Sequence, residues 1–397
     1  MMISKRKVLL RGPFTIASGY GTHARQIAKW FYDNQDKFEI KFELTPWGDC
    51  YSIVDTEYDN GLIGWIYQSM VDEQYIQSNT FDLSVQVQLP NEWNPKIAVK
   101  NIGVTAGVEA TLCNPKWIES INSMSAVIVP SEFVKETFEA TSKITNQEIR
   151  TSIIVVPEAY DEAFGEKIEP LNLGIESKFN FLLFGQLTGN NPFNDRKNIP
   201  QAVKWFIEEF KGENDVGLVI KTGTARAQHF DRRSIAAVFQ QFLIEMGYDS
   251  DRDPRITIIH GNLSPQEVAG LYLNPTIKAL YAPTRGEGFF IPGINAAAVG
   301  MPVLATGWSA HTEYLNLGKW IKFDYELKEV HPSRVDDNIF MRGTQWAETK
   351  EADVKYKLRK FYTDSKLPTA WAEQTKTKIL ENYSIESIKK HYTRIFV

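Results

Sequence analysis

The residues best suited to chemistry are Arg285, Gly286, Glu287 and Gly288, which follow a strand-like apolar run and precede a run of small, helix-compatible residues. This charged turn therefore lies at the carboxyl end of a strand and opens a helix. Glycines let backbone N–H groups approach an anion, and the amino end of a helix favours negative charge. The Glu287 carboxylate can accept hydrogen bonds from sugar hydroxyls. The turn predicts a ligand site, against the alternative of an ordinary strand–turn–helix with a surface glutamate.

A second candidate site is the loop 185–198, which joins a strand to a helix beginning at Ile199. Arg196 and Lys197 lie at the start of that helix, where the helix dipole disfavours positive charge. A bound diphosphate would explain both cations, because arginine can bind two phosphate oxygens and lysine supplies a compact charge. The alternative is a solvated charged loop.

The first half of the chain holds weaker candidates. Gly19 and Gly21 lie in a loop that follows the first expected strand and opens a helix. Such a turn either contacts a ligand or is simply a tight connection. Glu109 lies at the carboxyl end of another expected strand, where it either orients or deprotonates a substrate hydroxyl or caps a helix. Ser131, followed by Glu132, is better explained as a helix cap than as a chemical group.

No residue pattern indicates a metal site. The segment 249–253 contains an Asp-x-Asp pattern, but it directly precedes Pro254 and is typical of a solvated turn. The six histidines show no ligand spacing. We therefore expect neither a metal nor a bound cofactor.

Strand and helix signals alternate along almost the whole chain, which is typical of βαβ units and a mostly parallel sheet. The expected strands are 7–11, 38–44, 82–89, 97–105, 125–130, 152–156, 179–185, 216–222, 255–260, 277–282, 302–306 and 320–324. The expected helices are 20–34, 115–123, 131–141, 198–210, 231–246, 264–273, 294–299, 311–317, 350–362 and 368–381.

A polar run with proline and glycine at 157–172 is the best candidate for a linker. A chain of 397 residues suits two α/β domains. We place an N-terminal domain at 1–163, a C-terminal domain at 164–383 and a last amphipathic helix at 384–397. Both domains are expected to be Rossmann-like and doubly wound.

Composition excludes some classes of protein. The formal net charge is −5, and residues 1–165 hold 14 lysines and arginines against 21 aspartates and glutamates, a poor surface for a polyanion. Cys50 and Cys113 form no ligand pattern and fit a reducing compartment. The chain runs directly from its basic N-terminus into a strand, and the longest uncharged stretch contains Pro292 and Pro302. We therefore expect no signal peptide, no membrane segment and a cytoplasmic location.

The segment 284–308 resembles the Glu-Gly-Phe-Gly…Glu-Ala segment of the retaining glycosyltransferases of the two-Rossmann-domain (GT-B) type, especially family 4. The resemblance covers most of the chain, from Gly19 to the last helix. It implies the GT-B fold: an N-terminal acceptor domain and a C-terminal donor domain that face a cleft, with the C-terminal helix crossing back to the first domain.

In that family the first glutamate contacts the donor sugar, and a second, eight residues on, contacts the nucleotide ribose. Glu287 matches the first, and Asn295 replaces the second. Lys197 matches the lysine that neutralises the leaving diphosphate. Gln186 replaces the accompanying arginine of the family.

We infer that Arg196 or Lys221 supplies the charge missing at the Gln186 position. The resemblance further implies that Gly19 and Gly21 face the donor diphosphate, and that Glu109 faces the cleft from the acceptor domain. The other implied donor-binding positions are His260, Arg285, Gly286, Gly288, Phe289, Phe290 and His311.

The sequence thus predicts a retaining, metal-independent glycosyltransferase that moves a sugar from a nucleotide-sugar, such as a UDP- or GDP-sugar, to an acceptor hydroxyl. A saccharide or small molecule is favoured as the acceptor over a modified DNA base. The alternatives are a glycoside hydrolase, which would use Glu109 and Glu287 as its two carboxylates, and a catalytically idle protein that binds sugar nucleotides.

Overall fold

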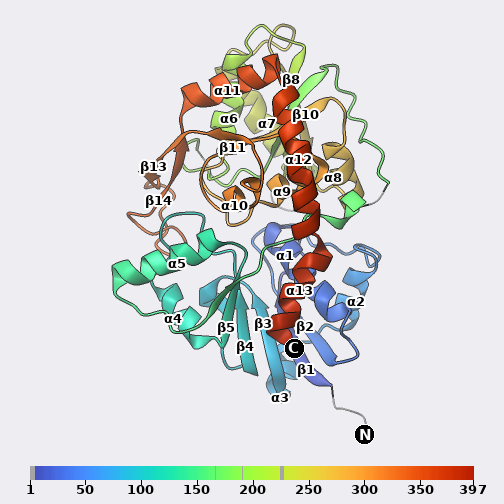
Figure 1. The fold of residues 1–397 in the computed structure, drawn as a ribbon, viewed down its shortest axis with the longest axis vertical. Coiled ribbons are helices and arrows are strands. Elements are labelled where there is room, and N and C mark those ends of the chain that lie inside the picture. Colours follow the sequence, from blue (N-terminus) through green and yellow to red (C-terminus); the bar gives the residue numbers. More distant parts are fainter. Residues whose placement is uncertain (1–4, 166, 190, 224–227) are drawn as a thin grey trace. The chain divides into compact units, whose positions relative to one another are not determined.

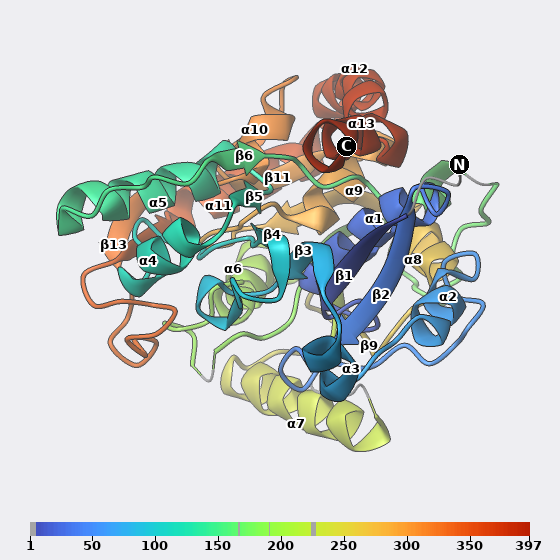
Figure 2. The ribbon, with the colours of Figure 1, turned by 90° about the horizontal axis from the view of Figure 1, so that it is seen from below.

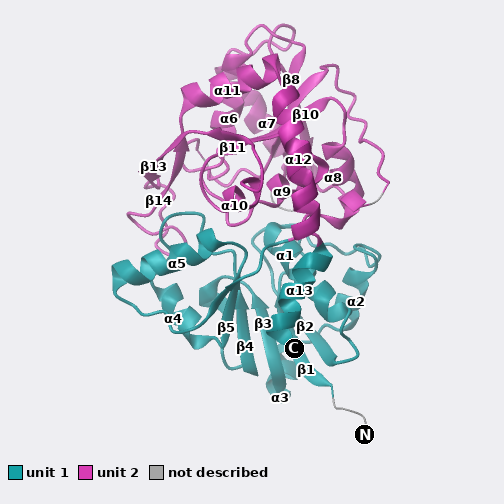
Figure 3. Cartoon of the chain, viewed as in Figure 1, with its two compact units in different colours: residues 1–158, 385–397 teal, residues 159–384 magenta. Residues whose placement is uncertain are grey.

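The computed structural model describes residues 5–165, 167–189, 191–223 and 228–397. The chain folds into two compact units, shown in Figure 3. Unit 1 comprises Met1–Glu158 and Ile385–Val397, and unit 2 comprises Ala159–Ser384. The division falls a few residues before the boundary that the linker composition indicates, and the segment Ile385–Val397 belongs to the first unit.

Unit 1 is built on a parallel sheet in the order β2-β1-β3-β4-β5-β6. Figure 2 shows β2, β1, β3 and β4 of this sheet. Its strands are β1 (Arg6–Gly12), β2 (Phe38–Leu44), β3 (Phe81–Val87), β4 (Ala98–Val104), β5 (Ala126–Val129) and β6 (Ile153–Val155). Its helices are α1 (Gly19–Tyr32), α2 (Leu62–Gln68), α3 (Glu73–Ser78), α4 (Lys116–Ser123), α5 (Glu132–Thr145) and α13 (Ile385–Phe396), with a short 3-10 turn, η1 (Pro90–Glu92).

The last helix, α13, is amphipathic and packs its apolar side on α1. The Phe396 ring lies 5.2 Å from the Trp30 ring and 5.0 Å from the Phe31 ring, measured between centroids. The Trp30 indole N–H also donates to Thr393 Oγ1 at 2.9 Å. The apolar side of α13, with Ile388, Tyr392 and Phe396, is thus buried in unit 1. Figure 1 shows α13 in red.

Unit 2 is built on a second parallel sheet, in the order β12-β11-β10-β7-β8-β9. Its strands are β7 (Phe179–Phe184), β8 (Val216–Thr222), β9 (Arg255–His260), β10 (Ile277–Ala282), β11 (Val303–Thr306) and β12 (Ile321–Phe323), with a separate antiparallel hairpin of β13 (Tyr325–Glu329) and β14 (Gln345–Thr349). Its helices are α6 (Ile199–Glu209), α7 (His229–Glu245), α8 (Pro265–Tyr272), α9 (Ile291–Val299), α10 (His311–Leu315), α11 (Glu351–Thr363) and α12 (Lys366–Asn382), with a 3-10 turn, η2 (Glu162–Gly165).

Central strands of unit 2, such as β7 and β10, are largely buried and consist mostly of apolar residues. In unit 1, β3 also buries the polar side chains of Ser84 and Gln86. Two apolar clusters sandwich the sheet of unit 2. One gathers around Phe181, Phe206 and Tyr281, and the other around Leu182, Leu280 and Ile294. Neighbouring residues of one strand thus face opposite clusters, as the two-residue period of a strand requires.

The two alternating series of strands and helices predicted from the sequence are confirmed. The prediction missed α2, α3 and the β13–β14 hairpin. The two helices are short, with seven and six residues, and the hairpin strand β13 is largely exposed, so none carries a strong apolar period. Among the described residues, no helix combines the length and apolar character that crossing a membrane requires.

Candidate functional site

The strongest candidate site lies where the strand order of unit 2 reverses. Written from the other edge, the sheet runs β9-β8-β7-β10-β11-β12, so the chain builds outward in one direction from β7 and in the other from β10. Loops leaving two such neighbouring strands diverge, and the crevice at their carboxyl ends is where open α/β sheets bind ligands. The two loops here carry the cations at 196 and 197 and the carboxylate at 287.

Glu287 is buried between these two cations. Lys197 Nζ lies 2.8 Å from both carboxylate oxygens, and Arg196 Nη1 lies 3.2 Å from Oε2. Only 4% of the Glu287 side chain is exposed, against 13% for Arg196 and 16% for Lys197. Burial alone would raise the pKa of Glu287, but Lys197 and Arg196 outweigh it and hold that pKa below its ordinary value. Glu287 is therefore an ionised group with two compensating cations.

Asp195 shapes the loop that presents the two cations. Its carboxylate accepts hydrogen bonds from the backbone N–H and hydroxyl of Thr188 and from the N–H of Ile199, each at 2.7 Å. It therefore satisfies the first turn of α6 and compensates the positive charge there. Asn190, which belongs to the same loop, lies outside the described residues.

Three non-glycine residues with positive φ border Glu287. They are Asn198 at 57°, Phe290 at 77° and Ser309 at 80°. Asn198 Nδ2 donates to the Pro283 carbonyl at 3.0 Å, and Ser309 Oγ accepts from the Glu287 N–H at 3.0 Å. Such backbone is costly for L-residues and gathers where the surroundings enforce a functional geometry. The strain here lies in the loops that surround one carboxylate.

His311 is a buried, neutral imidazole. Burial lowers its pKa, although the Thr306 carbonyl and Glu287 act in the opposite direction. Its Nε2 lies 2.7 Å from the Thr306 carbonyl, which can only accept, so Nε2 carries the proton. Its Nδ1 then faces the Ser309 hydroxyl at 3.4 Å as an acceptor. His311 thus supports Ser309, which in turn holds the backbone of Glu287.

Arg285 contributes to the structure of the loops, and the donor-binding role expected for it stays a prediction. Its guanidinium is 2% exposed and forms a two-point ion pair with Glu348. It also donates to the carbonyls of Pro192 and Asp195, and it lies 5.3 Å from the Trp346 ring centroid. Through these contacts Arg285 joins the two loops to the β13–β14 hairpin.

The two phenylalanines after Gly288 are packed into the core. Phe289 lies 5.5 Å from the Tyr314 ring, and Phe290 lies 5.6 Å from the His311 ring, both centroid to centroid. Phe290 also lies 5.5 Å from Lys197 Nζ. Their side chains pack against α9 and Lys197. Phe289 and Phe290 could therefore contact a ligand only through their backbone groups.

Gly286 and Gly288 are buried in the same turn. The Gly286 carbonyl accepts from Arg196 Nη1 at 2.7 Å, so this backbone is tied to the cationic loop. We retain both glycines as candidate positions for close approach of a ligand.

Asn295 lies on α9 and is 4% exposed. Its Oδ1 accepts from the Asp161 N–H at 3.0 Å, so it anchors the segment that begins unit 2. Its amide Nδ2 makes no hydrogen bond within the part of the chain that the structure describes. The contact with Asp161 was not expected from the sequence.

The remaining predicted positions of unit 2 lie at the carboxyl ends of β7, β8 and β9. Gln186 is exposed just after β7. Lys221, near the end of β8, is buried, donates to the Gly261 carbonyl, and has a pKa lowered by burial to about 8. His260 ends β9, and burial, followed by the charge of Lys221, lowers its pKa. No contact joins Lys221 to the Glu287 cluster in the described structure, so Arg196 is the cation placed there.

Three predicted positions belong to unit 1. Gly19 is exposed at the start of α1. Gly21 is buried, and a Cβ there would lie 1.9 Å from the Ile16 carbonyl oxygen, so the turn itself requires glycine. Glu109 is half-buried in the loop between β4 and α4, and it precedes the first turn of α4, which it therefore does not cap. Ser131 does cap α5, accepting from the Val134 N–H at 3.3 Å.

Asp195, Ser309 and Glu348 support the site, and none of them was predicted from the sequence. Asp195 could have been recognised as a residue that caps a helix, because it lies four residues before Ile199, near the start of a predicted helix. Ser309 and Glu348 could not have been recognised, because their partners Glu287 and Arg285 are distant in the sequence.

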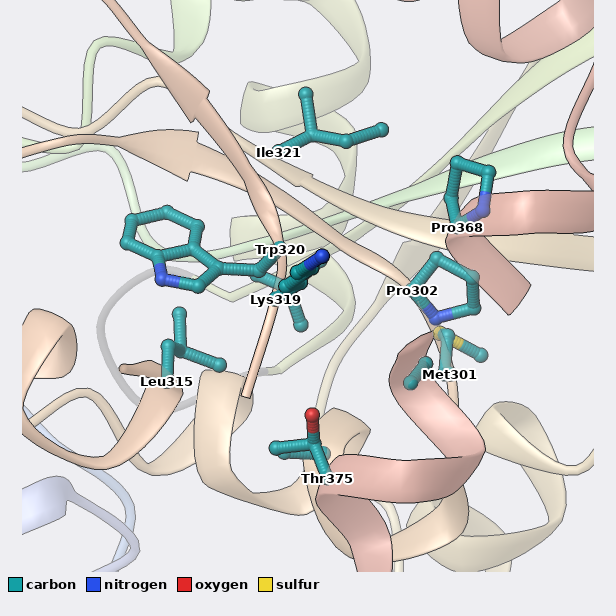
Figure 4. Close-up of a pocket in the computed structure, with 11 residues that line it drawn as sticks. Met301, Pro302, Leu315, Lys319, Trp320, Ile321, Pro368 and Thr375 are labelled. Carbon is teal, nitrogen blue, oxygen red and sulfur yellow. The ribbon is translucent and has the colours of Figure 1, made fainter. Parts of the chain in front are cut away.

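Figure 4 shows a separate small cavity in unit 2, lined by α9, α10, β12 and α12. Its volume is about 20 Å³, room for about one water molecule. Its walls are mostly apolar, with Trp320, Pro302 and Pro368 among them, and it includes none of the Glu287 cluster. The described residues also contain no group of three or more His, Cys, Asp or Glu side chains arranged to hold a metal.

No protein-family model matches this chain, and no curated protein matches it in sequence. Solved structures do match its fold. HepE of Anabaena, in complex with UDP and glucose, is 12% identical with a TM-score of 0.59, covering 98% of this chain and 99% of that one. Sucrose-phosphate synthase of Thermosynechococcus elongatus is 11% identical with a TM-score of 0.61, covering 99% and 98%.

The pneumococcal O-GlcNAc transferase GtfA, in complex with UDP and GlcNAc, is more distant: 13% identity, a TM-score of 0.52, and coverage of 81% of this chain and 58% of that one. Likeness at these identities concerns the fold. It confirms the predicted GT-B fold class, with its two parallel six-stranded sheets and flanking helices.

Proposed function

We propose that this protein is a retaining glycosyltransferase that transfers a sugar from a nucleotide-sugar to an acceptor hydroxyl without a metal ion. The observation that carries the proposal is the Lys197–Glu287–Arg196 cluster at the topological switch point of unit 2. Support also comes from fold neighbours whose structures hold UDP with a sugar. A UDP-sugar is therefore the first donor to test, followed by a GDP-sugar.

The cluster is suited to a departing diphosphate. Glu287 compensates Lys197 and Arg196 in the present structure, and the two side chains remain partly exposed, so a diphosphate can join them without a large rearrangement. Cations held in place before reaction stabilise charge that develops on a leaving group, an effect often worth about 3–4 kcal/mol of barrier. The same cations replace the metal that other sugar transferases would need.

The remaining residues position the sugar and the nucleotide. Glu287 accepts a hydrogen bond from a donor-sugar hydroxyl, and backbone groups of Gly286 and Gly288 approach the phosphates. Asn295 donates a hydrogen bond from its amide Nδ2 to a ribose hydroxyl. In the transfer step the acceptor oxygen bonds to the anomeric carbon as the bond from that carbon to the diphosphate oxygen breaks. Because attack occurs on the face of the leaving group, the acceptor proton passes to the departing diphosphate and configuration is retained.

A glycoside hydrolase explains the cluster less well. It needs two carboxylates about 5–10 Å apart, one of them an acid with a raised pKa. Glu287 has a lowered pKa, and the carboxylate oxygens of Asp195, the other buried acid of these loops, accept hydrogen bonds from the backbone. Two cations on one carboxylate serve a phosphate better than a neutral glycoside.

The test is donor hydrolysis, with water in place of the acceptor. The protein is incubated with UDP- and GDP-sugars, and the released nucleoside diphosphate is measured by chromatography. We expect slow release from one donor, undiminished by excess EDTA, and an anomeric configuration retained in the product. Loss of activity in EDTA that manganese restores would overturn metal independence. Cleavage of aryl glycosides would indicate a hydrolase, and nucleotide binding without turnover would indicate an idle binding protein.

A further inference from the structure

The strand β9 forms one edge of the unit 2 sheet. It pairs with β8 on one side, and no other strand of the described residues pairs with its second side. Its six residues, Arg255–His260, include no proline or lysine, the residues with which proteins commonly block such an edge. An edge that is not blocked can pair with a strand of another chain.

The backbone of Ile258 faces this edge. The Gly261 N–H donates to the Thr222 carbonyl of β8 at 3.3 Å, and alternate residues of a strand direct their backbone groups to the same side. Thr257 and Ile259 therefore bond to β8, whereas Ile258 directs its N–H and its carbonyl outward. Within the described part of the chain, neither of these two groups has a hydrogen-bond partner.

An apolar groove lies beside the same edge, between α7 and β9. Its volume is about 320 Å³, and Ala236, Ile244, Tyr248 and Ile258 are among the residues that line it. Ile244 is 63% exposed. The Tyr248 hydroxyl donates to the Pro254 carbonyl at 3.0 Å and so covers only the start of the edge. Figure 2 shows α7 in yellow-green. A chain that extended the sheet at Ile258 would also cover this groove.

The charge along α7 favours a second copy of this chain as the occupant. Because α7 connects two parallel neighbours, β8 and β9, it runs opposite to β9. Its basic end, residues 228–234, holds two arginines and one aspartate that caps the helix. Its acidic end, residues 245–253, holds four acidic residues and one arginine. Two β9 strands that pair antiparallel place the basic end of each copy beside the acidic end of the other.

The charged side chains at both ends are available for such a contact. Arg232 and Arg233 are exposed, and neither forms an ion pair with any described residue. Within the acidic end, Asp249 already pairs with Arg252 at 2.7 Å. The exposed acids Glu245 and Asp251 have no cation as a partner among the described residues, so they are the groups that would face the arginines of the other copy.

We propose that this protein forms a two-fold symmetric dimer in which the β9 strands of two copies pair antiparallel and join two sheets into one. At the axis, the Ile258 N–H of each copy donates to the Ile258 carbonyl of the other. The same face of α7, with Ala236 and Ile244, lies on both sides of the axis, as an isologous interface requires. The dimer does not depend on the proposed function.

The test measures molar mass in solution by sedimentation velocity at several protein concentrations. The wild type should reach twice the mass of one chain. Ile258→Pro removes the outward N–H but leaves the bonds to β8, and Ile244→Asp places a charge in the groove, so both variants should be monomers. Ile144→Asp is the matched control, because it changes a 70% exposed isoleucine of α5 in unit 1, and it should remain a dimer. Circular dichroism verifies that each variant is folded.

Charge reversal tests the antiparallel arrangement. Arg232→Glu/Arg233→Glu makes the basic end acidic, and it should raise the dissociation constant of the dimer about tenfold or more, because each charge contact occurs twice across the axis. Glu245→Arg/Asp251→Arg makes the acidic end basic and should have the same effect. The variant that combines all four changes should recover most of the affinity, since opposite charges face each other again.

Three outcomes would overturn the proposal. A wild type that stays monomeric at every concentration would mean that the edge is open or takes a strand of a different protein. A dimer that persists in folded Ile258→Pro and Ile244→Asp would place the interface elsewhere. Failure of the four-fold charge variant to recover affinity would exclude the antiparallel pairing.

Discussion

Lys197 Nζ lies 2.8 Å from both carboxylate oxygens of Glu287 and so joins the loop after β7 to the loop after β10. These two strands are neighbours in space, although 90 residues separate the paired side chains in the sequence. The ion pair therefore bridges the point where the sheet reverses its order. Arg196 binds the same carboxylate, so removal of either cation leaves Glu287 with one partner.

Replacing Lys197 with alanine should lower the rate of transfer about 10²–10³-fold, the effect of removing one preorganised charge from a developing anion. Because Arg196 still compensates Glu287, the free energy of unfolding should fall by no more than about 3 kcal/mol. Steady-state kinetics and urea denaturation check the two values. Lys204→Ala is the matched control, since it removes an exposed lysine from α6. Near-normal turnover in Lys197→Ala would refute the phosphate role.

Most strands and helices could be predicted from the sequence, because many buried parallel strands are rich in apolar residues and are separated by turn residues. The short helices α2 and α3 and the β13–β14 hairpin, whose first strand is largely exposed, were missed because their apolar residues do not form such runs. The order of the strands could be inferred only through the family resemblance, since the pairing of β7 with β10 is a long-range contact.

The candidate site was predicted in part. Glu287 and Lys197 were named from their local turns, but their contact could not be derived from spacing alone. The ion pair of Arg285 with Glu348 could not be predicted, because Glu348 comes from a hairpin that the sequence did not reveal.

Arg285→Lys should destabilise the protein by about 2–4 kcal/mol. A lysine cannot reproduce the two-point pair with Glu348 or contact the Pro192 and Asp195 carbonyls together. Glu348 would keep the Trp346 indole N–H but lose its two-point partner. Urea denaturation measures the loss. A double-mutant cycle with Glu348→Gln should give a coupling energy above about 1 kcal/mol. If the Arg285→Lys protein is fully stable but binds the nucleotide more weakly, Arg285 binds the donor.

Asn295→Asp should bind UDP as tightly as the wild type or more tightly. An aspartate keeps an oxygen for the Asp161 N–H, and its charge strengthens a hydrogen bond from a ribose hydroxyl. Asn295→Leu is the control, because it removes both the oxygen and the nitrogen of the amide. It should weaken UDP binding and lower the free energy of unfolding. Isothermal calorimetry measures the affinity. Weaker binding by a fully stable Asn295→Asp protein would place the ribose elsewhere.

Unit 1 contains a buried cluster of polar side chains that can change charge with pH. His23 Nδ1 lies 3.9 Å from Glu158 Oε1, and both side chains are almost fully buried. His23 Nε2, Glu158 Oε2 and the Tyr392 hydroxyl have no hydrogen-bond partner among the described residues. Burial raises the pKa of Glu158 from 4.5 to about 8 and lowers that of His23 from 6.5 to about 4. Both groups are therefore neutral in the folded protein near pH 6.5.

These two pKa shifts act on stability in opposite directions. The protonated Glu158 contributes stability that is complete below pH 4.5 and is lost as pH rises toward 8, whereas the contribution of His23 is lost as pH falls from 6.5 toward 4. The two offset each other between pH 4.5 and 6.5, so Glu158 dominates above that range. From pH 6.5 to 8 the wild type should lose about 2 kcal/mol relative to Glu158→Gln, because an amide cannot ionise. Urea denaturation at both pH values tests this, with the exposed Glu139→Gln as control. Parallel pH profiles for wild type and Glu158→Gln would mean that Glu158 is ionised in the folded protein.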